Sequence, residues 1–183
     1  PNWNEETEIS DQIAINRANP NVNGSVFFSM KPLLRNPLGV QDSLINTYWK
    51  YPSFVPAMPL LSKVNPARAT ICRVEGTTKS VKLTWNLCEL LSADEMPFYF
   101  ALYRFDGEGV GKFDNPRNLL GFTPFYAEKM TFEDYTAIEG EYYTYVVVSY
   151  NRANVKSLGS DPMFVKKTKK SAKRKRKFWG YLL

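Results

Sequence analysis

Histidine is absent from all 183 residues, and cysteine occurs only twice. Without histidine the chain cannot build a Ser-His-Asp or Cys-His catalytic site, nor a histidine-ligated zinc site. Two cysteines alone are too few for a structural zinc site. The general acids and bases that remain are carboxylates, lysine, tyrosine and cysteine. We therefore expect no cofactor and no metal.

Long apolar runs are also missing, because no stretch of 18 consecutive apolar residues occurs. The sequence therefore predicts no transmembrane segment. No signal peptide precedes the first predicted helix, and the chain opens at Pro1 instead of at methionine. We expect this sequence to be a piece of a longer protein, so the missing signal peptide does not show where that protein resides.

Acidic residues are lacking from one segment. Residues 166–177 read KKTKKSAKRKRK and hold nine lysines or arginines. The formal net charge of +6 comes from this run, because the rest of the chain has 15 basic and 18 acidic residues. Nucleic-acid binding would have to rest on this segment alone, and we regard nucleic acid as an unlikely partner.

Three interpretations of this tail stay open. Its cations could neutralise phosphates of nucleic acid or of anionic lipid head groups. It could be a solvated extension. The third interpretation, which we favour, is that the apolar end FWGYLL docks on the body through Phe178, Trp179 and Tyr181.

Aromatic residues are plentiful, at 15% of the chain, and favour strands. Before the strands, residues 4–18 predict a helix capped by Asn4, and the apolar run within 22–30 predicts a strand buried on both faces. After a turn at 34–38, residues 39–50 predict a second helix. Four prolines within 52–66 then indicate a stiff, extended linker laid over a surface.

From residue 68 onward the pattern contains strands alone. Val81, Leu83, Trp85 and Leu87 alternate with polar residues, which predicts one buried and one open face. The run around Phe98–Tyr103 predicts a strand covered on both sides. Seven strands indicate a sandwich; their expected ranges are 70–75, 81–87, 97–105, 118–122, 128–133, 142–151 and 160–166.

The stretches VKLTWNL, FYFALYRFDG and GEYYTYVVVSYNRANVKSLGS carry a family resemblance. The early Trp85, the Tyr-Arg-Phe strand and the Tyr-x-Tyr-x-Val strand with its Asn-Arg turn occur in an order that resembles a fibronectin type III-like domain. The resemblance covers residues 68–166 and implies an immunoglobulin-like sandwich.

The first part is similar to the end of the glycosyl hydrolase-like 10 family of bacterial (β/α)8 barrels. The matching stretches are EISDQIAINRAN, NGSVFFSMKPLL and DSLINTYWKYPSFVPAMP. The resemblance implies the last barrel helices, the eighth strand and a proline-rich exit into a C-terminal sandwich. Barrel strands one to seven, and any catalytic carboxylates on them, are absent, so the family's activity does not carry over to this chain.

Function in a barrel lies at the C-terminal ends of the strands. Ser29 and Lys31 are therefore substrate-cleft candidates, followed by Asn36 and Trp49. The alternative is that Ser29 caps a turn and Lys31 is solvated. No catalytic residue is expected.

Glycoside hydrolysis needs paired carboxylates. Asp94-Glu95 and Glu133-Asp134 are pairs of this kind, but they are placed near strand ends, where we expect solvated acids.

Cys72 and Cys88 fall too far apart on a predicted hairpin for a disulfide, which needs Cα atoms within about 7 Å. We expect two free, mostly buried thiols.

A set of four tyrosines is interpreted as core or cross-strand pairs, or alternatively as a sugar-stacking platform: Tyr99, Tyr103, Tyr143 and Tyr145.

The sequence thus predicts a mostly β chain. Residues 1–65 form a helix-strand-helix barrel remnant with its linker, 66–166 a seven-stranded fibronectin III-like sandwich, and 167–183 a basic and aromatic tail. We expect a non-catalytic module that supports or positions the barrel of a bacterial glycoside hydrolase. Its expected partners are that barrel and a polysaccharide or cell-wall glycan, outside the cytoplasm. The alternative is a stand-alone glycan- or protein-binding module.

Overall fold

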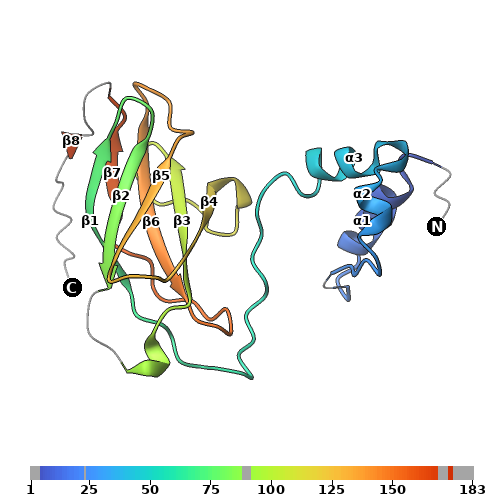
Figure 1. Cartoon of the computed structure of the whole chain (residues 1–183), viewed down its shortest axis with the longest axis horizontal. Coiled ribbons are helices and arrows are strands. Elements are labelled where there is room, and N and C mark those ends of the chain that lie inside the picture. Colours follow the sequence, from blue (N-terminus) through green and yellow to red (C-terminus); the bar gives the residue numbers. More distant parts are fainter. Residues whose placement is uncertain (1–4, 23, 88–91, 169–172, 175–183) are drawn as a thin grey trace. The chain divides into compact units, whose positions relative to one another are not determined.

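The computed structural model describes residues 5–22, 24–87, 92–168 and 173–174. The chain divides between Pro52 and Ser53 into two compact units, which are described separately. Helices make up the first unit: α1 (Glu8–Ala18), α2 (Lys31–Leu34), a 3-10 turn at Pro37–Gly39 and α3 (Val40–Asn46). Strands make up most of the second unit (Figure 1).

A small apolar core holds the first unit together. Ile9 and Ile13 of α1 pack with Leu33, Val40 and Leu44. The stripe predicted on the first helix is thus confirmed, although the helix begins at Glu8, and the predicted cap, Asn4, lies outside the described residues.

The second predicted helix, over 39–50, is shorter than expected. It ends at Asn46 because Thr47 leaves the helical region, at φ −111° and ψ −81°. Before it, the short helix α2 carries Pro32 in its first turn.

The strand predicted over 22–30 does not form within the described residues. This segment is extended but has no strand partner, and it leaves Val26 and Phe28 fully exposed. The physical reason is that a strand requires a neighbour to hydrogen-bond its backbone. The apolar pattern indicated burial on both faces, but in the described part of the first unit Phe27 alone of Val26, Phe27 and Phe28 packs against the core.

The seven strands of the sandwich are confirmed, with shifts of at most three residues at their ends. An eighth, two-residue strand adds to them. They are β1 (Ala69–Gly76), β2 (Val81–Leu87), β3 (Tyr99–Asp106), β4 (Leu119–Pro124), β5 (Lys129–Asp134), β6 (Tyr142–Tyr150), β7 (Met163–Lys166) and β8 (Lys173–Arg174).

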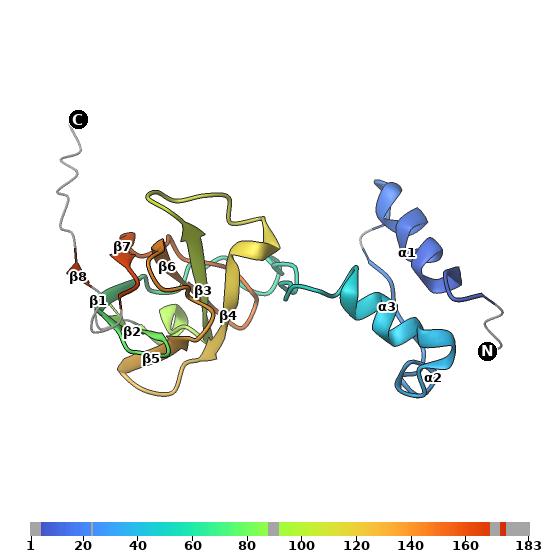
Figure 2. The ribbon, with the colours of Figure 1, turned by 90° about the horizontal axis from the view of Figure 1, so that it is seen from above.

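All strand pairs are antiparallel, and they form two sheets. The smaller sheet has the order β1-β2-β5 and the larger has the order β4-β3-β6-β7-β8. Figure 2 shows them as two layers, with β1, β2 and β5 facing β3, β6 and β7. A 3-10 turn at Ala93–Glu95 precedes β3, and another at Pro116–Asn118 precedes β4.

The main core lies between the two sheets. Trp85 is completely buried, and its ring meets the ring of Phe100 edge-on, with centroids 5.5 Å apart. Val81, Leu83 and Trp85 point inward, as their alternation predicted. Phe98 departs from the prediction, because it precedes β3 and is 49% exposed.

Cys72 is free but exposed, so the prediction of a buried thiol was wrong. The register of β1 on β2 shifts between Ile71 and Arg73, and this bulge leaves Cys72 without a partner in the ladder. Ala69 and Ile71 are buried on the inward face of β1, so the ordinary alternation of a strand already places Cys72 on the outward face. Cys88 lies outside the described residues.

Candidate functional site

The outer face of the larger sheet is unusually aromatic. Alternation on β3 places Tyr99, Tyr103 and Phe105 on this face, opposite the face that packs against the smaller sheet. Tyr150 at the end of β6 lies directly across from Tyr99 in the ladder. Their rings stack with centroids 5.0 Å apart and planes 4° from parallel. An antiparallel pair brings opposite side chains close enough for such a stack.

The segment 53–66, which we call the strap, covers part of this face. Phe54 stacks on Tyr150 at 4.9 Å and on Tyr103 at 6.2 Å, and it meets Phe122 of β4 edge-on at 5.0 Å. Stacked and edge-on arrangements are the favourable ones for aromatic pairs. The expectation that this segment lies over a surface is confirmed, and that surface is the sandwich itself.

Polar contacts fix the strap along its length. The amide of Met58 donates to the carbonyl of Ala153 at 2.8 Å. The side-chain amide of Asn151 donates to the carbonyl of Val64 at 2.9 Å and to Ser62 Oγ at 3.3 Å. Ser149 Oγ donates to the Ala67 carbonyl just beyond the strap. These contacts make the strap a docked part of the second unit.

At the start of β3, the aromatic face reaches solvent. Tyr99 is partly buried, and its hydroxyl donates to Asn154 Oδ1 at 3.0 Å. Burial, together with Tyr150 beside it, raises the pKa of Tyr99 to about 12. The guanidinium of Arg152 lies over the ring of Phe98, 4.6 Å from its centroid. An ordered group of aromatic and polar side chains thus lies at this end of the sheet.

The structure separates the four tyrosines that were predicted as core or as a platform. Tyr103 lies on the outer face under Phe54, whereas Tyr143 and Tyr145 point into the core between the sheets. All three are buried, which matches the core interpretation, and Tyr99 alone of the four is partly exposed.

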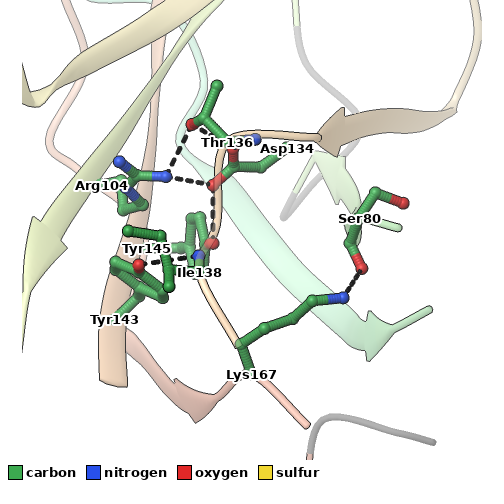
Figure 3. Close-up of polar contacts among 8 residues, drawn as sticks. All are labelled: Ser80, Arg104, Asp134, Thr136, Ile138, Tyr143, Tyr145 and Lys167. Atoms are coloured by element: carbon green, nitrogen blue, oxygen red, sulfur yellow. Dashed lines mark hydrogen bonds and ion pairs between the residues drawn. The ribbon is translucent and has the colours of Figure 1, made fainter. Parts of the chain in front are cut away.

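A buried polar network joins the two sheets near the other end of β3 (Figure 3). Asp134 Oδ2 accepts from Arg104 Nη1 at 2.9 Å and from the Tyr145 hydroxyl at 2.8 Å. Asp134 Oδ1 accepts from the Thr136 amide at 2.8 Å and from Thr136 Oγ1 at 2.7 Å. The side chain of Asp134 is 1% exposed, so the expectation of a solvated acid here was wrong.

The network holds Asp134 as an anion. Burial alone would raise the pKa of its carboxyl group, but the Thr136 hydrogen bonds, the Arg104 cation and the Tyr145 hydroxyl hold that pKa below its ordinary value. Burial and the neighbouring Asp134 raise the pKa of the Tyr145 hydroxyl. A general acid near neutral pH needs a raised carboxyl pKa and access to substrate, and Asp134 has neither. Its role is structural.

The other predicted acids do not build a catalytic pair. Asp94 and Glu95 lie in the 3-10 turn before β3, and Glu95 Oε2 accepts from Ser92 Oγ at 3.4 Å. Glu133 accepts a hydrogen bond from Ser80 Oγ at 3.0 Å, and hydrogen bonds from Tyr135 and Ser80 lower the pKa of its carboxyl group.

The four substrate-cleft candidates all lie in the first unit. Ser29 Oγ accepts from the backbone amide of Lys31 at 3.3 Å, which is a turn-capping contact, and Lys31 is exposed. Asn36 Oδ1 accepts from the Gln41 amide at 2.8 Å. Trp49 meets Phe27 edge-on at 5.9 Å. Their role in a cleft stays a prediction.

The first unit has an open hollow of about 510 Å³ between α1 and the extended segment after it. Its lining residues are Ile9, Gln12, Ile13, Asn16, Val22, Gly24, Ser25, Val26, Phe27 and Phe28. None of the four cleft candidates is among these described lining residues, so the structure does not gather them into this hollow.

Lys167 is buried at the end of β7, where the predicted tail was expected to begin. Its ammonium donates to the Ser80 carbonyl at 2.8 Å (Figure 3). It also donates to the Thr77 carbonyl, and both carbonyls belong to the β1–β2 turn. Lys173 and Arg174 of the basic run pair with β7. The predicted docking of Phe178, Trp179 and Tyr181 lies outside the described residues.

Over the described ranges, no helix has the length and apolar character that crossing a membrane requires. In the same ranges, no three His, Cys, Asp or Glu side chains are grouped so that they could hold a metal ion.

Sequence reasoning missed Phe54, Phe122 and Arg152 as members of the aromatic group. Their partners are 49 to 96 residues away or on another strand, and no local pattern records such contacts. One signal was available, because Phe54 is an aromatic residue within a proline-rich linker. A large apolar side chain in such a segment indicates that the segment packs on a surface and is not fully solvated.

Comparison with known proteins relates the chain to one glycosyl hydrolase. No family model matches it. The curated Glycosyl hydrolase YngK of Bacillus subtilis (strain 168) is 32% identical over 160 residues, which are 87% of this chain and 30% of that protein. The chain therefore spans less than a third of this relative and is similar in sequence to part of a glycosyl hydrolase.

Two solved structures are more distant. One, described as a myokine structure, is 17% identical with a TM-score of 0.40, covering 57% of this chain and all of that one. The other, pectate lyase PelI from Erwinia chrysanthemi in complex with tetragalacturonic acid, is 18% identical with a TM-score of 0.38, covering 54% and 28%. Neither likeness is close enough to carry weight.

Proposed function

We propose that the chain is a non-catalytic module of a glycoside hydrolase, in which the sandwich supports or positions a catalytic domain joined through the first unit. One observation carries the proposal: the strap is docked on the sandwich through Phe54, which packs against Tyr103, Tyr150 and Phe122. Docking of the strap shortens the free linker between the sandwich and an attached domain, so it restricts the movement of that domain. The sequence similarity to part of a glycosyl hydrolase supports the proposal that the attached domain is a glycoside hydrolase.

We propose that the sandwich is fibronectin III-like. The strand orders β1-β2-β5 and β4-β3-β6-β7, with Trp85 buried on the second strand, support this assignment. Further support comes from Tyr143 near the start of β6, whose hydroxyl accepts from the Ile138 amide at 3.0 Å. A tyrosine that bonds back to the backbone just upstream is a feature of immunoglobulin-like corners.

We propose that the first unit is the end of a (β/α)8 barrel, with the extended segment at 22–30 as its last strand. Support comes from the order helix, extended segment, helix, and from the exposed Val26 and Phe28, which a neighbouring barrel strand and helix would cover. Under this proposal Ser29, Lys31, Asn36 and Trp49 lie near the substrate cleft, and the rest of the barrel is the main partner.

We further propose that the substrate is a cell-wall or other complex glycan outside the cytoplasm. The sequence resemblance to bacterial glycosyl hydrolase-like barrels and the relation to a glycosyl hydrolase support a glycan. The location rests on the resemblance alone.

A second candidate function is a stand-alone binding module. The partly exposed aromatic rings at the start of β3 favour it, since exposed aromatic groups on a rigid sheet are typical of binding surfaces.

The non-catalytic role is tested by measuring reducing-sugar release from a panel of soluble polysaccharides. The purified chain should release none above a heat-denatured blank. Release that the double substitution Asp94→Asn with Glu95→Gln abolishes would show an enzyme and overturn the proposal. These two acids are suitable because they are paired and accessible, and the buried Asp134 is not involved.

A further inference from the structure

Two aromatic rings, Phe98 just before β3 and Phe122 on the neighbouring strand β4, are open to solvent although they belong to an ordered cluster. Phe98 is 49% exposed and Phe122 is 39% exposed. Tyr99 lies between them and meets each ring near a right angle, at 6.4 Å from Phe98 and 5.7 Å from Phe122. With Arg152 and Asn154 these three residues form what we call the aromatic ledge.

The ledge is held in place before any ligand arrives. The Tyr99 ring is stacked on Tyr150, and its hydroxyl is bonded to Asn154. Phe122 is held by the edge-on contact with Phe54 of the strap. Side chains that are already ordered lose little conformational entropy when a ligand binds. Even weak contacts with the ledge can therefore contribute to affinity.

Polar groups border the apolar rings. The Arg152 guanidinium lies over Phe98 at 4.6 Å, and Arg152 is exposed. Asn154 uses Oδ1 to accept from Tyr99, which orients its amide group and leaves the Nδ2 donors directed elsewhere. Asn154 adopts a left-handed conformation, with φ 57°, that turns the loop at this point. The ledge therefore combines flat apolar surface with N–H donors.

A sugar ring matches this combination. One face of a pyranose presents C–H groups that pack on an aromatic ring, and its rim presents hydroxyl groups that accept from N–H donors. A stable protein interface buries about 800 Å² per partner, which is far more than two partly exposed rings and two polar side chains provide. The chemistry therefore favours a sugar over a protein partner.

We propose that the aromatic ledge is a glycan-binding site, which stacks pyranose units of a polysaccharide on the Phe122 and Phe98 rings and bonds their hydroxyls through Arg152 and Asn154. This inference rests on the proposed glycoside hydrolase relation for its choice of ligand. It extends that proposal, because it gives the sandwich a binding function of its own.

Affinity gel electrophoresis of the purified chain tests the site, with soluble glucan, xylan, mannan, polygalacturonate and cell-wall glycan fragments as probes. We expect at least one polymer to retard the chain. Phe122→Ala and Arg152→Ala should each weaken that retardation about tenfold. The matched control is Tyr135→Ala, which removes a tyrosine that is 67% exposed beside Asp134, near the other end of β3.

Phe122→Leu separates binding from folding. Leucine keeps apolar contact with Phe54 but removes the flat ring, so this variant should unfold near the wild-type temperature and still bind weakly. The inference is overturned if no polymer is bound, or if Tyr135→Ala weakens binding as much as Phe122→Leu. Neither result affects the non-catalytic role, because reducing-sugar release tests that role independently.

Discussion

The two units of the chain treat apolar side chains differently. Among its described residues, the first unit buries five apolar side chains and exposes eight large ones: Ile15, Val26, Phe28, Met30, Leu34, Leu38, Ile45 and Trp49. The sandwich buries its large residues between two sheets, with Trp85, Phe100 and Tyr145 almost inaccessible. Isolated exposed apolar residues are ordinary, but this proportion is typical of a surface that packs on another piece of protein. The sandwich has a large core of its own, whereas the described part of the first unit exposes more large apolar residues than it buries.

The largest expected effect comes from the core of the sandwich. Trp85→Ala should lower the free energy of unfolding of the sandwich by about 3–5 kcal/mol, because it leaves a cavity between the sheets. Leu44→Ala is the comparison, since Leu44 is equally buried but lies in the first unit. Differential scanning calorimetry should show the main transition shifted by the first substitution alone. Equal shifts would mean that the two units unfold together.

The next effect tests the network that joins the sheets. Asp134→Asn leaves Arg104 without its anion and should cost about 3 kcal/mol, as the loss of one partner of a buried ion pair does. The pKa of Asp134 is lower in the folded chain than the ordinary value of about 4. Its stabilisation is therefore complete above about pH 4 and is lost as the pH falls through the folded pKa.

Denaturant unfolding at a series of pH values from about 2 to about 7 measures this dependence. The wild-type chain should lose stability at the acidic end, and Asp134→Asn should lose less there. The same pH profile in both proteins would show that Asp134 does not hold the sheets together in the way described.

A smaller effect is expected where the strap meets the sandwich. Phe54→Ala should destabilise by about 1–2 kcal/mol, because Phe54 is only partly buried but contacts three aromatic rings. Limited proteolysis with mass spectrometry should detect new cleavage within residues 53–66. Val55→Ala is the matched control, since Val55 is 62% exposed and adjacent. If Val55→Ala opens the strap equally, Phe54 is not its anchor.

The smallest effect is expected in the extended segment of the first unit. Phe28→Ser should change the stability of this chain by less than about 0.5 kcal/mol, because the Phe28 side chain is fully exposed. Phe27→Ala should cost more, since Phe27 contacts Trp49. Circular dichroism during thermal unfolding compares the two. A larger loss for Phe28→Ser would mean that this side chain is already packed within the unit.

The sequence is sufficient to predict where the strands of the sandwich lie, but not in every case which of their side chains face inward or where the pairing is irregular. Residues 81–87 form β2 as predicted, because an inward and outward alternation is a local property. Cys72 was misplaced because Ala69 and Ile71 take the inward positions of β1, and which face of a strand packs inward depends on the neighbouring sheet. The segment at 22–30 also depends on contacts that the local pattern does not encode. Its apolar run predicts which side chains are buried, but a strand also needs a neighbouring strand to hydrogen-bond its backbone.

The candidate site was less predictable than the fold. Tyr99 was singled out from its strand spacing, but Phe54 and Arg152 reach the same face from 45 residues before it and 53 residues after it. Asp134 looked like a loop acid in the sequence, and only the approach of β3 and β6 surrounds it with Arg104 and Tyr145. Contacts over such separations are set by topology, which local patterns do not encode.

Lys167 sets the C-terminal boundary that this sandwich needs if it is moved intact into another protein. A piece cut after Lys166, at the end of β7, would remove the ammonium that joins the β1–β2 turn through Ser80. The turn carbonyls would then lose a charged donor, and hydrogen bonds to charged groups are among the stronger ones. Any gene rearrangement that moved the sandwich intact into another protein would have to carry Lys167 along, although its codon lies within the basic run.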